Sequence, residues 1–167
     1  LKMHATISTS LSLRFENKDL VDDLSAQIAE RKRSEEALRL SNERFELAAE
    51  GSREGLWEVS GSADDLFNPH HPIYYSPRFK ALLGFTDQEF PNVLASWASR
   101  LHPDDQPRVF AALQAHLERK APYEIEYRLL TKGGDYRWYT ARGQALWDET
   151  GRPFRMAGSM SDITERK

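Results

Sequence analysis

Histidines and paired acids are the side chains of this sequence that could bind a metal or move a proton. His70-His71 lies between two prolines in a polar segment, where two adjacent ligands make only a weak metal site. The acidic pairs Asp64-Asp65 and Asp104-Asp105 are neighbours along the chain, whereas glycosidase carboxylates face each other across a cleft. We therefore expect these acids to form turns and helix starts, and the sequence predicts no metal site.

The 167 residues include no cysteine, which removes several kinds of chemistry. There is no thiolate nucleophile, no zinc-thiolate site and no disulfide framework. Flavin photochemistry that forms a cysteine adduct is excluded for the same reason. The sequence also lacks a phosphate-binding glycine loop, a nucleophile elbow and a zinc-protease helix. We therefore expect no catalytic residues in this chain, and no feature of the sequence requires a cofactor.

Charge and hydropathy exclude further classes of partner. The net charge of −3 supplies no cationic field, so we expect no binding to nucleic acid. No apolar run approaches the roughly 20 residues that a membrane-spanning helix needs. The sequence begins at Leu1 and not at methionine, so we expect it to be part of a longer protein, which leaves room for an upstream membrane anchor.

The first part of the chain has the sequence pattern of a long helix. From about Ser12 to Glu50 there is neither proline nor glycine, and apolar residues recur at helical spacing. The seam of this stripe consists of Leu20, Leu24, Ile28 and Leu38. Polar residues at other seam positions and a change of spacing near Leu24 both weaken a coiled coil. We interpret the segment as a marginally stable parallel coiled coil that forms a homodimer; the alternative is a helix that folds against its own domain.

The remainder has the pattern of a compact α+β domain. Apolar and alternating runs predict five strands, at residues 56–59, 73–75, 123–130, 136–147 and 154–163. Helices are predicted at 77–83 and 103–121, and Gly51 is expected to end the long N-terminal helix. This order of elements predicts a five-stranded antiparallel sheet with helices on one face, preceded by the long helix.

The last five residues, Ile163 to Lys167, nearly repeat Ile28 to Lys32. The first copy continues into a run of strong helix formers, so we expect a helix to enter the domain and another to leave it. Asp162 precedes Glu165 by three residues, which is the spacing of a capping box. Asp162 and Thr164 are therefore the predicted signal junction between the last strand and an exit helix. The alternative is that they only stabilise the start of that helix.

Four motifs occur in order in the second part of the chain. They are His102-Pro103-Asp104-Asp105, Glu126-Tyr127-Arg128, Gly134-Asp135-Tyr136-Arg137-Trp138 and Asp162-Ile163-Thr164-Glu165-Arg166-Lys167. Together they resemble a PAS domain with its C-terminal PAC motif. The helix before them resembles the signalling helices that join bacterial sensor modules. The resemblance implies a signalling helix or coiled-coil linker at residues 1–44 and a PAS/PAC sensor domain at 45–167.

The resemblance also implies a function and a setting. PAS modules of this kind belong to bacterial multidomain sensors, in which they dimerise and pass a conformational signal to a covalently linked C-terminal output domain. The output domain that the resemblance implies is a two-component histidine kinase, a diguanylate cyclase or a chemoreceptor output. The implied location is the cytoplasm, either in a cytoplasmic protein or in the cytoplasmic part of a membrane-anchored sensor.

Two alternatives for the domain interior remain open: a sensor that binds heme or a small ligand, and a ligand-free structural relay. A pocket would be bordered by Trp57, Tyr75, Phe79, Leu83, Phe110 and Tyr127. A relay would fill that space with the same side chains. Helix-borne histidines ligate heme in some PAS sensors, which makes His116 the candidate ligand. We interpret His116 as a structural histidine, because it lies toward one side of the apolar face of its helix.

Overall fold

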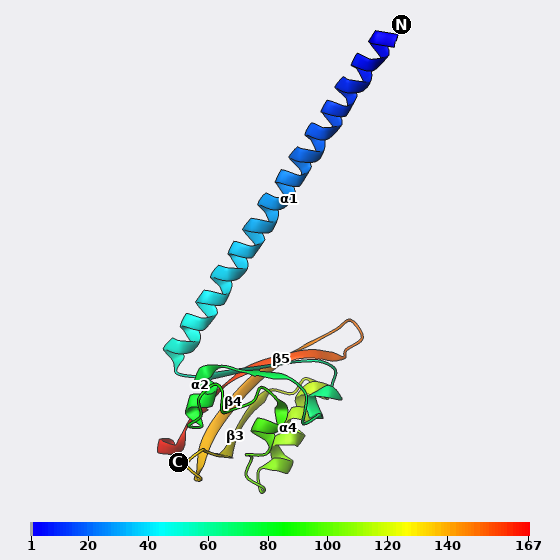
Figure 1. Ribbon diagram of the computed structural model, residues 1–167. Coiled ribbons are helices and arrows are strands. Elements are labelled where there is room, and N and C mark those ends of the chain that lie inside the picture. Colours follow the sequence, from blue (N-terminus) through cyan, green and yellow to red (C-terminus); the bar gives the residue numbers. More distant parts are fainter. Residues whose placement is uncertain (1) are drawn as a thin grey trace. The chain divides into compact units, whose positions relative to one another are not determined.

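The computed structural model describes residues 2–167 (Figure 1). Contacts within the chain divide it into two compact units, of which the first ends at residue 48 and the second spans residues 49–167. The first unit consists of most of the long helix, and the second contains the end of that helix and a five-stranded antiparallel sheet with shorter helices. The predicted α+β class with a long N-terminal helix is confirmed.

Helix α1 spans Lys2–Ser52. Ion pairs one turn apart support it, among them Arg31 with Glu35 at 3.0 Å and Arg39 with Glu43. Such exposed pairs contribute only a few tenths of a kcal/mol each. The seam side chains Leu20, Leu24, Ile28 and Leu38 are all exposed in the single chain. Helix α1 therefore offers an apolar stripe that its own ion pairs do not cover.

The end of α1 differs from the prediction. Gly51 is helical, and the helix continues to Ser52. Arg53 adopts the left-handed conformation with a φ of 60°, and Ser52 Oγ donates a hydrogen bond to the Ala49 carbonyl at 2.9 Å. The expectation that Gly51 ends the helix is wrong, because the left-handed position that usually favours glycine is filled by Arg53.

The sheet has the strand order β2-β1-β5-β4-β3, and every neighbouring pair is antiparallel. The strands are β1 (Gly55–Ser60), β2 (Ile73–Tyr75), β3 (Tyr123–Leu130), β4 (Tyr136–Trp147) and β5 (Pro153–Asp162). Each boundary lies within one residue of the predicted one. Because β5 is the middle strand, the chain leaves the sheet from its centre.

The helices of the domain are short except for one. They are α2 (Pro77–Leu82), α3 (Leu94–Ala98) and α4 (Gln106–Arg119), with 3₁₀ turns η1 (Asp65–Phe67) and η2 (Thr164–Arg166). Helix α4 starts three residues later than predicted, because residues 103–105 form a turn. It ends at Arg119, and the next residue, Lys120, adopts a left-handed φ of 55°. The turn places Asp105 directly before the helix, where its side chain faces β3.

The core lies between the helices and one face of the sheet. Alternate residues of β3 are buried, and Val109 and Leu117 of α4 are buried with them. Trp57 of β1 packs directly on the backbone of β5 at Gly158. A Cβ atom there would lie 2.5 Å from the Trp57 ring and 2.0 Å from the Arg142 carbonyl oxygen. Only glycine fits this position, and the indole is held against the sheet as a result.

Candidate functional site

A cavity of about 50 Å³ lies in the interior of the domain. Of the six predicted pocket residues, four line it: Trp57, Tyr75, Phe79 and Tyr127. The other two lie outside its wall. Leu83 is fully buried in the core, and Phe110 packs against the rings of Phe67 and Trp97, each with centroids 6.1 Å apart. Four of the predicted residues therefore line part of a real hollow, and its use as a ligand site stays a prediction.

Two of the tyrosine hydroxyls at this cavity are hydrogen-bonded within the protein. Tyr127 Oη accepts a hydrogen bond from Trp97 Nε1 at 3.2 Å, and Tyr75 Oη donates one to the Val93 carbonyl at 3.1 Å. Burial raises the pKa of both tyrosine hydroxyls far above their usual value, so both are neutral. The cavity is thus apolar and uncharged, and it is small beside the about 300–1,000 Å³ of typical ligand pockets.

His116, the candidate heme ligand, lies outside the cavity wall and is 2% exposed. Its Nε2 accepts the backbone N–H of Ala145 at 3.0 Å, and its Nδ1 donates to the Ala121 carbonyl at 2.6 Å. A neutral imidazole has one acceptor and one donor, so both are used. The ring also packs against Trp147, with centroids 5.4 Å apart. His116 therefore joins α4 to β4 and presents no free nitrogen to a metal.

The predicted signal junction is a set of hydrogen bonds around the end of β5. Asp162 Oδ1 accepts the backbone N–H of Thr164 at 2.9 Å and its hydroxyl at 2.6 Å. Asp162 Oδ2 accepts a bond from Arg137 Nη1 at 2.9 Å. The carboxylate thus binds the amide two residues on, as in an Asx turn, and the residue before η2 is Ile163 without a side-chain cap. The expected capping box is replaced by this tighter turn.

The residues Ile163 to Lys167, which we call the exit segment, are bonded back to β4. Thr164 Oγ1 accepts the backbone N–H of Trp138 at 3.1 Å, and Ile163 N–H donates to the Trp138 carbonyl at 2.9 Å. The structure therefore brings together Asp162 and Thr164 and adds Arg137 and Trp138 to them, and their role as a signal junction stays a prediction. Both additions belong to a motif that the sequence displays, but no sequence argument had given them a role.

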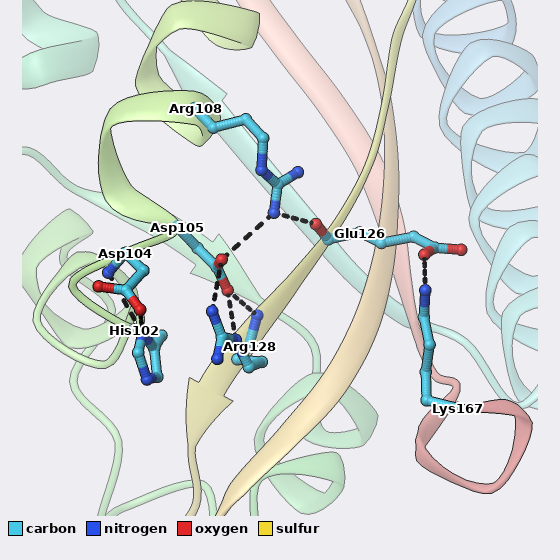
Figure 2. A network of polar contacts seen from close by, with 7 residues as sticks. All are labelled: His102, Asp104, Asp105, Arg108, Glu126, Arg128 and Lys167. Carbon is cyan, nitrogen blue, oxygen red and sulfur yellow. Dashed lines mark hydrogen bonds and ion pairs between the residues drawn. The ribbon is translucent and has the colours of Figure 1, made fainter.

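Sequence reasoning also missed an ion pair at the start of α4 (Figure 2). The Asp105 carboxylate accepts three hydrogen bonds from Arg128: from its backbone N–H, its Nε and its Nη2, all at 2.9 Å. Arg108 Nη2 lies 3.4 Å from the same carboxylate. The Arg128 guanidinium lowers the pKa of Asp105 to about 2. The only signal in the sequence was that both residues lie in motifs of the resemblance.

Within residues 2–167, no group of three or more acidic or histidine side chains is arranged to hold a metal ion. The described helices also include none that is both long enough and apolar enough to cross a membrane.

Comparison with known proteins shows a family to which the chain is similar. The family model described as "PAS fold" matches residues 72–160, just over half of the chain. The sensor protein FixL of Bradyrhizobium diazoefficiens is 30% identical over 125 residues, which are 75% of this chain and 23% of that protein. The chain therefore spans about a quarter of the length of this curated relative.

Solved structures agree with the family match. A sensory box histidine kinase/response regulator from Burkholderia thailandensis is 43% identical, with a TM-score of 0.62 over 74% of this chain and 86% of that one. The N-terminal domain of a diguanylate cyclase with PAS/PAC sensor from Marinobacter aquaeolei is 26% identical, with a TM-score of 0.56 over 68% and 97%. With the five-stranded sheet, the family match and these relatives in agreement, the chain belongs to the PAS domain family.

Proposed function

We propose that this chain is a sensory and relay module of a multidomain signalling protein. Helix α1 pairs with α1 of a second copy, and a covalently linked output domain reads the state of the PAS domain through the exit segment. The output domain is of the histidine kinase or diguanylate cyclase type, since proteins with these names share its fold at 43% and 26% identity. The module itself is not catalytic, works in the cytoplasm and binds no nucleic acid.

The observation that carries this proposal is the bonding at the end of β5. The middle strand of the sheet turns into the exit segment at Asp162, and Thr164 is bonded both to Asp162 and to Trp138. A displacement of β4 relative to β5 must therefore stretch or break bonds to the exit segment. A flexible tether would need none of these bonds, whereas a transmission element requires them.

Dimerisation through α1 is supported by its exposed seam. Leu20, Leu24, Ile28 and Leu38 share one side of the helix, although two consecutive four-residue steps interrupt the heptad spacing, and they are 47–65% exposed in the single chain. Full burial of a leucine or isoleucine side chain contributes about 1.5–3 kcal/mol. Pairing two copies along this seam accounts for apolar side chains that would otherwise face water.

A second candidate function is the binding of a small apolar molecule in the cavity. Its apolar, uncharged wall supports this, and its volume of about 50 Å³ restricts it. Apolar cavities of about 150 Å³ admit benzene. Heme does not fit the residues present, because the cavity is too small and both nitrogens of His116 are used. Absorption and native mass spectra of the purified chain test this candidate: a stoichiometric added mass would support ligand binding, whereas spectra without a chromophore or added mass would favour the ligand-free relay.

A chimeric kinase tests the relay. This chain replaces the matching PAS segment of the Burkholderia thailandensis kinase, and autophosphorylation is measured for Asp162→Ala and Thr164→Val. We expect both variants to shift the kinase activity severalfold, and Thr164→Ser to restore it because it keeps the hydroxyl. The control is Thr150→Val, which removes a hydroxyl bonded to Asp148 in the β4–β5 hairpin. Kinase activity indifferent to both junction variants contradicts the relay.

A further inference from the structure

The buried carboxylate of Asp105 links the start of α4 to β3 through hydrogen bonds. The Asp105 side chain is 6% exposed, and both of its oxygens bind Arg128. A buried charge that loses its partner is strongly destabilising, so the position of the helix start and that of Arg128 depend on each other. Leu113 and Leu117 of α4 also line the cavity. A change in the shape or contents of the cavity therefore acts on the same helix.

Arg128 in turn contacts the tryptophan that holds the exit segment. Arg128 and Trp138 are direct cross-strand partners, and the Arg128 Cζ lies 5.2 Å from the centroid of the Trp138 ring. The Lys167 Nζ lies 4.8 Å from the same centroid. Both distances are those of cation–π contacts. The ring of Trp138 thus contacts a cation from β3 and a cation from the exit segment.

The backbone of Trp138 adds to this contact. It is hydrogen-bonded to Ile163 and Thr164, so Trp138 contacts three of the five residues of the exit segment. A parallel connection runs through Glu126, whose carboxylate pairs with Lys167 and whose carbonyl accepts a bond from Arg108 Nη2 at 2.7 Å (Figure 2). Both routes begin in or just before the first turn of α4 and end at Lys167.

We propose that Arg128 and Trp138 are positioning residues that couple the start of α4 to the exit segment. In this mechanism Asp105 sets the position of the Arg128 guanidinium. The guanidinium in turn affects the position of the Trp138 ring, and through Trp138 the positions of Lys167 and Thr164. The proposal rests on the relay function, since it names the connection by which the domain interior reaches the junction. It assigns a coupling role to residues that do not line the cavity.

A double-mutant cycle between residues that do not touch each other tests this coupling. Asp105→Asn and Lys167→Gln are made singly and together in the full chain, and native-state amide exchange of Ile163 and Arg166 is measured. Both amides are hydrogen-bonded at the junction. We expect the combined change in exchange rate to differ from the product of the single changes by roughly threefold or more. The Met160 amide in the core of β5 reports global unfolding and serves as the internal reference.

The tryptophan and a neighbouring ion pair supply the controls. In a Trp138→Leu background the backbone bonds remain but the ring is lost, so the coupling should fall to within error of zero. The matched control is Glu124→Gln with Lys167→Gln. Glu124 pairs with Arg142 on the same two strands, at 2.8 Å, outside the contacts with Trp138. This control pair should act independently.

Specific results overturn the proposal. Independent effects of Asp105→Asn and Lys167→Gln would show that the two ends are not coupled, and a coupling that survives Trp138→Leu would assign it to the Glu126 route instead. If Asp105→Asn unfolds the chain, Arg128→Lys replaces it in the cycle, since lysine keeps the charge but loses the planar two-point contact. The chimeric kinase measures the relay separately, so a failure of the relay and a failure of the coupling give different results.

Discussion

The imidazole of His116 accepts the backbone N–H of Ala145 at 3.0 Å, and this bond joins α4 to β4 in the core. We expect His116→Ala to lower the free energy of unfolding by about 2–4 kcal/mol, because it leaves a cavity and an unsatisfied buried amide. Urea denaturation measures this change. Replacement of the exposed His70 by alanine should cost less than about 0.5 kcal/mol.

The same bond leads to an expectation about heme. When this protein is mixed with heme, we expect no stoichiometric Soret band that depends on His116. Ligation of iron by Nε2 would require His116 to break its hydrogen bond with the Ala145 amide. A band that appears at one heme per chain and is lost in His116→Ala would contradict the structural role. It would favour a heme-based sensor instead.

Asp105 predicts a specific loss of stability in acid. Its pKa in the folded chain is about 2, below the ordinary 3.8. Between these values the unfolded chain binds more protons, so stability falls as the pH drops from about 4 to 2. Above about pH 4 the ion pair contributes its full share to the free energy of unfolding, which is about 2 kcal/mol. We expect Asp105→Asn to remove this part of the pH dependence, as measured by urea denaturation from pH 5 to pH 2. An unchanged pH profile would contradict the role of the Asp105–Arg128 pair.

The strands were predictable because their sequence alternates. In β3, Ile125, Tyr127 and Leu129 alternate with polar residues, and this pattern determines both the element and its buried face. The end of α1 was less predictable, because glycine usually takes the left-handed position that follows a helix, whereas here Arg53 takes it. Local patterns thus located the elements better than their exact ends.

The site was predictable only where it is local in sequence. Asp162 and Thr164 lie two residues apart, so their bond follows from the turn chemistry of aspartate. Asp105 and Arg128 lie 23 residues apart, and their pairing depends on how α4 lies on β3. The size of the cavity depends on the packing of many side chains, which no periodicity encodes. Four residues of the cavity lining could therefore be named from the sequence, but the rest of the lining and the volume could not.

The close packing around Gly158 predicts that a single added methyl group there lowers the stability of the domain severely. Gly158→Ala would place a Cβ 2.0 Å from the Arg142 carbonyl oxygen and 2.5 Å from the Trp57 ring, so β5 or the indole must move. We expect a loss of at least about 3 kcal/mol in the free energy of unfolding. The matched control is Gly51→Ala in α1, where a Cβ meets nothing within 4 Å and should stabilise the helix slightly. A loss in Gly158→Ala no larger than about 1 kcal/mol would show that this packing is not tight.

The seam of α1 predicts how the oligomeric state responds to charge. Leu24→Glu with Ile28→Glu places four carboxylates in the interface of a parallel dimer, where burial of charge is costly. We expect the dissociation constant to rise at least about 100-fold, measured by sedimentation across a concentration series. The control is Leu40→Glu with Leu47→Glu, two exposed leucines seven residues apart that lie off the seam. The seam variant should become monomeric while the control remains dimeric. Equal dimerisation of both variants would place the interface outside α1 and contradict the coiled coil.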